Sequence, residues 1–169
     1  MNENETMRKE LLALLDGGNA HMTFEEAVAD FPLDRINTKP ARCPYSFWHL
    51  VEHIRICQWD IIEFVVNPQH VSPRWPEGYR PKPSQTTDES GWFGSIEAAV
   101  RDLERVKALV RDPQTDFFAP IAHAPDYTIF REVVLVADHN SHHTGELAMM
   151  RQIEGLWPHD RPYLTGESS

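Results

Sequence analysis

Cysteine is scarce in this sequence of 169 residues, which contains only Cys43 and Cys57. Two thiols are too few for the disulfide framework of a small secreted domain, so we expect both to be free in a reducing compartment. The N-terminal residues MNENETMRKELLALL also lack the basic start, apolar middle and cleavage site of a secretory signal. These two absences predict a cytoplasmic protein.

Long apolar runs and clustered basic residues are missing as well. No apolar run approaches the roughly 18 residues of a membrane span, so we predict no membrane partner. Only 16 Lys and Arg stand against 26 Asp and Glu, and they are scattered. A nucleic-acid partner is therefore not expected, because binding phosphates needs a basic face. The hydrophobic content of 41% suffices for one core, and we expect a single domain over residues 1–169.

No strand pattern and no internal repeat competes with helical periodicity. Apolar residues recur every three or four positions in four segments, which predict helices over about residues 5–30, 46–66, 90–111 and 128–156. Gly17-Gly18 would break or bend the first helix, and Ser46 is a candidate N-cap of the second. The expected fold class is all-α, an antiparallel four-helix bundle whose core can host a metal site.

The segments between these helices are expected to be loops. Residues 67–87 contain five prolines, which predicts a long proline-rich loop between the second and third helices. Its Trp75 and Tyr79 either cover a pocket or simply hold the loop to the bundle. Residues 113–127 form a second predicted loop, and we expect the ends, about 1–4 and 160–169, to be poorly ordered.

The segment DHNSHHTGEL, residues 138–147, carries the strongest chemical signal. His139 and His143 are four residues apart, which places two imidazoles on one face of a helix, close enough to share a metal ion. Both belong to an apolar stripe that faces the core: Val136, His139, His143, Leu147, Met150, Ile153 and Trp157. Buried imidazoles need partners, and a divalent metal would satisfy both.

The second predicted helix offers the third ligand. One edge of that helix carries a stripe of polar and thiol side chains: His49, His53, Cys57 and Asp60. His53 is the first candidate and His49 the second. Three neutral histidines around one divalent ion leave a position open for water or substrate, as in catalytic sites.

Other polar residues near the motif admit several roles. Glu146 would complete the coordination, accept a hydrogen bond from a ligand imidazole, act as a general base, or lie at the edge of the bundle. His142 points about 100° away from His143. We expect it either to contact a metal ligand without binding the metal or to lie on the surface. His21 is expected at the edge of the core, and Asp138 is expected to be exposed.

These residues resemble a known family. SFWHLVEHIRICQWDI, residues 46–61, is similar to the second-helix motif of the DinB-like (YfiT/DinB) metal-binding four-helix-bundle superfamily. DHNSHHTGEL is similar to its fourth-helix motif, H-x-x-x-H-x-G-Q-L, with Glu146 where glutamine is usual. The resemblance implies metal ligands at His53, His139 and His143. It also implies an up-down-down-up bundle, often a dimer, and zinc or nickel as the metal.

The resemblance leaves the reaction open, since the superfamily includes thiol-dependent transferases, isomerases and proteins without a known reaction. Our first hypothesis is a metal-dependent enzyme that activates water or a thiol for hydrolysis of, or transfer to, a small molecule. Such an enzyme would use Glu146 as its catalytic residue and a low-molecular-weight thiol as a further cofactor. The alternatives are a non-catalytic, stress-related metal-binding interaction module and a metal-free bundle.

Overall fold

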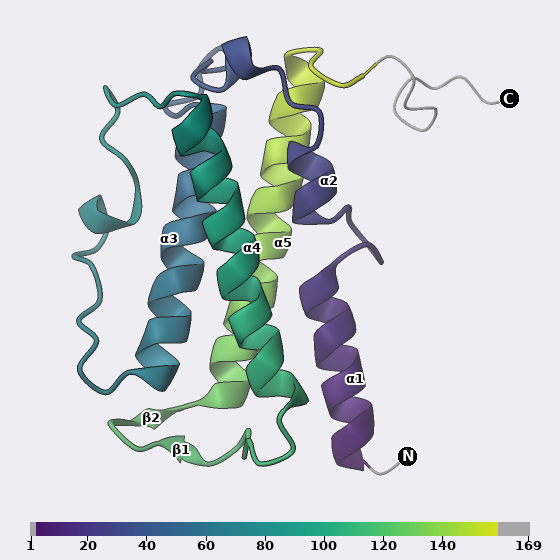
Figure 1. The fold of residues 1–169 in the computed structure, drawn as a ribbon, viewed down its shortest axis with the longest axis vertical. Helices are drawn as coiled ribbons and strands as arrows, with labels where there is room; N and C mark the ends of the chain where they lie inside the picture. Colours follow the sequence, from purple (N-terminus) through teal and green to yellow (C-terminus); the bar gives the residue numbers. More distant parts are fainter. Residues whose placement is uncertain (1–2, 159–169) are drawn as a thin grey trace, which may run out of the picture.

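The computed structural model describes residues 3–158, which form a mostly helical domain (Figure 1). Five helices are present in this range: α1 (Glu3–Asp16), α2 (Phe24–Val28), α3 (Phe47–Val66), α4 (Glu89–Arg111) and α5 (Ile129–Ile153). Two short 3-10 helices, η1 (Leu33–Arg35) and η2 (Glu77–Tyr79), lie in the connections. The expected disorder of residues 1–4 and 160–169 lies outside the described residues, except that α1 includes residues 3 and 4.

The helix predicted over residues 5–30 is broken, and not merely bent, at the two glycines. Gly17 and Gly18 have φ angles of +72° and +77°, which glycine adopts at low cost and which end α1. Thr23 then starts α2 with a capping box, in which its side chain accepts from the backbone N–H of Glu26. The break turns one expected helix into a long and a short one.

The predicted loop over residues 113–127 also contains a small hairpin, so the fold is not purely helical. Strand β1 (Pro120–Ile121) pairs antiparallel with β2 (Ala124–Thr128). Only Ile121 of the paired residues is buried. The strands therefore lack the alternation of buried and exposed residues from which a strand is predicted. Thr128 closes the hairpin and caps α5 by accepting from the backbone N–H of Arg131.

The four long helices lie side by side in Figure 1, with α1 and α5 running upward and α3 and α4 downward. Helix α3 packs against both α4 and α5, and α1 packs against the other faces of α4 and α5. Large side chains such as Trp92, Phe47 and Leu147 fill the space between them and are at most 1% exposed. This packing places one face of α3 directly against one face of α5.

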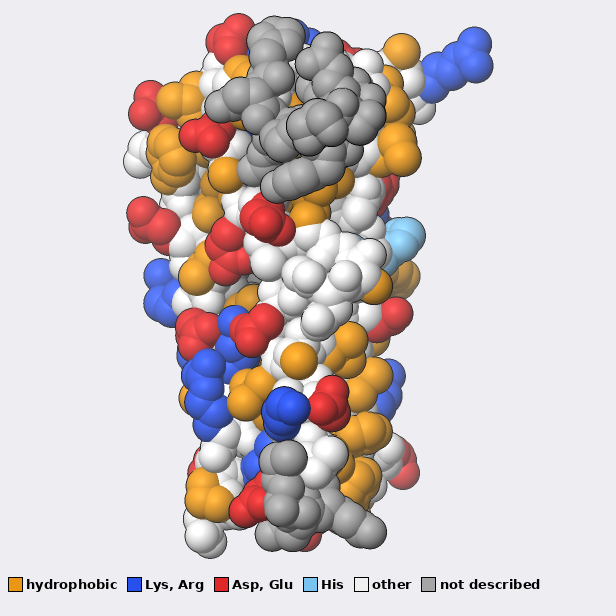
Figure 2. All heavy atoms as spheres, turned by 90° about the vertical axis from the view of Figure 1, so that its right-hand side faces the viewer, with side chains coloured by type: hydrophobic (Ala, Val, Ile, Leu, Met, Phe, Trp, Pro, Cys, Tyr) orange, Lys and Arg blue, Asp and Glu red, His pale blue; other side chains and the backbone are white. Residues whose placement is uncertain are grey.

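The surface agrees with the acidic composition. Figure 2 shows the face on the α1 side, where basic side chains are interspersed with acidic and hydrophobic ones and form no continuous stripe over the described residues. No helix within residues 3–158 has the length and apolar character that crossing a membrane requires.

Candidate metal centre

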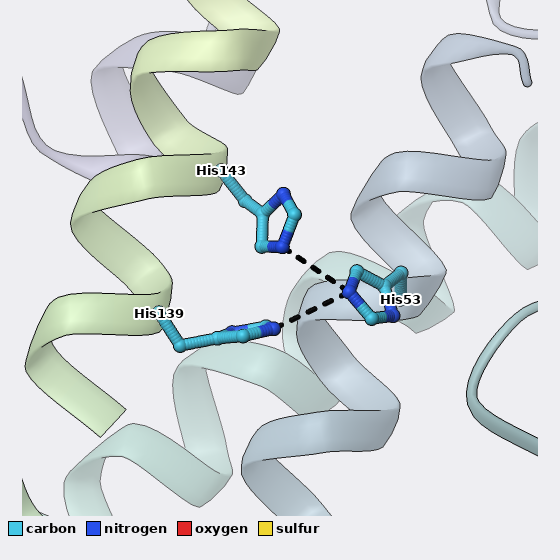
Figure 3. A group of neighbouring side chains, drawn as sticks. All are labelled: His53, His139 and His143. Carbon is cyan, nitrogen blue, oxygen red and sulfur yellow. Dashed lines mark hydrogen bonds between the residues drawn. The ribbon is translucent and has the colours of Figure 1, made fainter. Parts of the chain in front are cut away.

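The three predicted ligands meet where α3 packs against α5. Figure 3 shows the ring of His53 on α3 pointing toward His139 and His143 on α5. The Nε2 atom of His53 lies 3.2 Å from Nε2 of His143 and 3.3 Å from Nε2 of His139. One ligand atom from each of the three residues lies within 4.8 Å of the others, so together they could hold a metal ion.

The hydrogen-bond partners of these rings indicate which nitrogen of each ring carries the proton. Nδ1 of His53 lies 2.8 Å from the carbonyl oxygen of Tyr79, which can only accept, so this nitrogen carries the proton. Nδ1 of His143 lies 2.7 Å from Oε2 of Glu146, and an ionised Glu146 likewise requires an N–H there. The Nε2 atoms of both rings then present lone pairs to each other.

Two facing lone pairs repel unless a cation lies between them. A hydrogen bond between Nε2 of His53 and Nε2 of His143 would need a proton that both rings already carry on Nδ1. The separations of 3.2 and 3.3 Å match those expected for a zinc ion with Zn–N bonds of about 2.0–2.1 Å in tetrahedral geometry, about 3.3–3.4 Å. The donor set therefore fits a divalent metal ion.

Burial keeps these imidazoles neutral, as metal ligands must be. Desolvation and the neighbouring His53 lower the pKa of His139 to about 4. Desolvation, followed by His139 and His53, lowers the pKa of His143 to about 3. Desolvation also lowers the pKa of His53, against the opposing effect of the Tyr79 carbonyl. At neutral pH all three rings are available to a metal.

Glu146 takes the position of a group that orients a ligand. Its Oε2 accepts from His143, which is the usual way that a carboxylate fixes the tautomer of a metal-bound histidine. Burial raises the pKa of this carboxyl group. Glu146 also belongs to a second cluster, with His142 and His143, whose ligand atoms lie within 4.8 Å of one another. His142 is exposed in that cluster, which agrees with the second of the two placements that the sequence left open.

The other residues of the α3 stripe hold the proline-rich connection instead of a metal. Nε2 of His49 lies 3.0 Å from the carbonyl oxygen of Lys82, and its Nδ1 caps the helix with Ser46. Asp60 accepts from the hydroxyl of Tyr79 at 2.6 Å and from His70 at 2.7 Å. His49, the second candidate for the third ligand, is thus outside the histidine cluster.

Two further side chains are placed by the structure as the sequence suggested. His21 is half-buried in the turn before α2, and its Nδ1 lies 2.8 Å from the carbonyl oxygen of Met22. It does not belong to the histidine cluster. Asp138 is exposed. Cys57 lies 3.4 Å from Nδ1 of His53, but burial raises the pKa of its thiol to about 12, so it stays protonated at neutral pH.

Tyr79 is the residue that the sequence left undecided. Its carbonyl fixes His53 and its hydroxyl binds Asp60, so it holds the connection to α3 at two points. Trp75 is 71% exposed and rests on the Tyr79 ring. The backbone carbonyls of Tyr79 and Lys82 carry no signal in the sequence, because any residue supplies one; only the number of polar groups along α3 hinted that they needed partners.

Removing the Tyr79 hydroxyl should loosen the connection while leaving the carbonyl in place. We expect Tyr79→Phe to lower the free energy of unfolding by about 1.5–3 kcal/mol, the usual contribution of a hydrogen bond to a carboxylate. Amide hydrogen exchange should become faster in residues 70–82 and stay unchanged in α4. Tyr127→Phe, which changes another partly exposed tyrosine, is the control. Unchanged exchange in residues 70–82 would show that the hydroxyl does not hold the connection.

Comparison with known proteins adds one match. The family model described as the DinB superfamily matches residues 18–147, which include α3, α4 and all three histidines of the cluster. Neither a curated protein nor a solved structure shows significant similarity to the chain.

Proposed function

This chain belongs to the DinB superfamily, and on that premise we propose that it binds a divalent metal ion, zinc or nickel, through His53, His139 and His143. The observation that carries this proposal is the convergence of three Nε2 atoms whose rings, in two cases, carry their proton on the opposite nitrogen. The directions of α1, α3, α4 and α5 in Figure 1 further support assigning them as an up-down-down-up four-helix bundle.

The proposed activity is that of a metal-dependent enzyme acting on a small molecule by hydrolysis or by transfer of a thiol. Three protein ligands leave a position open, where the ion would supply Lewis-acid chemistry and lower the pKa of a bound water or thiol. Around it, the carbonyl of Tyr79 and Oε2 of Glu146 fix the tautomers of His53 and His143.

Glu146 is the proposed catalytic residue. Burial raises the pKa of its carboxyl group, which suits a group that accepts and returns a proton. We also propose that the protein uses a low-molecular-weight thiol as a second cofactor, forms a homodimer and is located in the cytoplasm.

Elemental analysis of protein purified without an affinity tag tests the metal directly. We expect close to one equivalent of a divalent metal, and less than about a tenth after gentle purification would overturn the proposal. The loaded protein should then be assayed against thiol-conjugation and hydrolase substrates, with chelator-treated protein as the control. Metal without turnover on a broad panel would contradict the enzyme and favour a non-catalytic metal-binding module.

A further inference from the structure

A pocket of about 470 Å³ lies between the start of α3 and the proline-rich connection. Its walls are mostly apolar, formed by Tyr45 and by prolines from both segments, with Arg80, Lys82 and His49 as polar groups. A volume of several hundred Å³ with apolar walls and a few polar groups is typical of small-molecule sites.

The pocket contains a cation that the protein does not neutralise. The guanidinium of Arg80 lies over the ring of Tyr45, 5.1 Å from its centroid. Among residues 3–158, no carboxylate lies within ion-pair distance of Arg80. Glu77, an acidic residue of the wall, faces Arg74 at 3.8 Å. In a chain of net charge −10, an arginine without a carboxylate partner in a pocket is suited to an anion from outside.

The pocket adjoins the histidine cluster. Arg80 directly follows Tyr79, whose carbonyl holds His53. The pocket residue His49 lies four residues, or about 6 Å along the helix axis, before His53 on α3. The positive charge of Arg80 helps to lower the pKa values of His53 and His143. Arg80 also lowers the pKa of Cys43, against burial and Glu146, which raise it. The pocket and the cluster are therefore neighbours along α3 and along the proline-rich connection.

We propose that this pocket binds a small organic acid, with its carboxylate on Arg80 and its apolar body against Tyr45 and the prolines. Arginine binds a carboxylate through two parallel N–H donors. Arg80, Lys82 and Glu77 together contribute one net positive charge to the wall, which matches a carboxylate better than a doubly charged phosphate ester. As the substrate-binding part of the enzyme, this pocket rests on the proposed function, whereas the binding of the acid requires no metal.

Calorimetric or NMR titration with phenylacetate tests the proposal, with neutral phenylacetamide and with phenyl phosphate as comparison probes. Phenylacetate should bind more tightly than either. Arg80→Gln should weaken its binding about tenfold or more, the effect of losing a charge-assisted hydrogen bond, and leave phenylacetamide unaffected. Arg74→Gln, a change in an exposed arginine of the same connection, is the matched control and should have little effect.

Titrating both loaded and chelator-treated protein separates this proposal from the metal proposal. Arg80-dependent binding that persists without metal supports the pocket even if the native protein proves metal-free. Binding that requires the metal and ignores Arg80→Gln would overturn the pocket and leave the metal site standing. Equal effects of Arg80→Gln and Arg74→Gln, preference for phenyl phosphate, or no binding of phenylacetate would each overturn it as well.

Discussion

His139→Ala and His143→Ala are each expected to lower the metal content of the purified protein from about one equivalent to less than about a tenth. Each substitution leaves two imidazoles, and removing one of three protein ligands removes most of the affinity for the ion. His53→Ala, which removes the ligand from α3, should have the same effect. Metal content is measured by elemental analysis of each variant after identical purification without an affinity tag.

The control for this series is His142→Ala, which changes an exposed histidine next to a predicted ligand. It should leave the metal content unchanged if the ion lies between α3 and α5. The alternative cluster of His142, His143 and Glu146 predicts the reverse, with metal lost from His142→Ala and kept by His53→Ala. Such a result would move the site to the outer face of α5.

Acid should destabilise the metal-free protein below about pH 6.5. Burial lowers the pKa of His139 to about 4 and of His143 to about 3, whereas an unfolded histidine titrates near 6.5. The unfolded state therefore takes up protons first, so the stabilisation is complete above pH 6.5 and is lost as the pH falls toward 4 and then 3. The expected loss is on the order of a few kcal/mol, measured by urea unfolding of chelator-treated protein across this range.

The double variant His139→Gln, His143→Gln provides the comparison for the pH series. Its free energy of unfolding should depend much less on pH between 6.5 and 4, because the two glutamines do not titrate. A slope equal to that of the wild type would show that other groups cause the acid sensitivity.

The same pKa values set the pH at which the protein loses its metal. Ordinary imidazoles would begin to lose a metal below about pH 6, but burial lowers the pKa of His139 to about 4 and of His143 to about 3, so these two ligands should hold it at lower pH.

Local signals in the sequence predicted most of the helices. Ser46 caps α3 as expected, and α4 (Glu89–Arg111) lies within a residue of its predicted range. The errors fall where local rules compete. Gly17 and Gly18 ended a helix that apolar periodicity would have continued, and Pro125 stands inside β2, where proline normally argues against a strand.

Parts of the site could likewise be predicted from the sequence, and other parts could not. The spacing of His139 and His143 is a property of one helix and could be recognised in the sequence. The residues of α3 ranked His53 ahead of His49, and the family resemblance favoured His53, but the physical reason lay outside the helix. It depends on which ring the carbonyls of Tyr79 and Lys82 reach from a distant connection. Arg80 was overlooked for the same reason, since its position beside the cluster follows from Tyr79.

The most direct test of the central claim is a crystal structure of the metal-loaded protein, with the ion located by anomalous scattering. We predict one strong peak about 2.0–2.1 Å from Nε2 of His53, His139 and His143, with non-protein density completing its coordination. A peak beside His142 and Glu146, or three rings without a common peak in a protein shown to contain metal, would contradict the account.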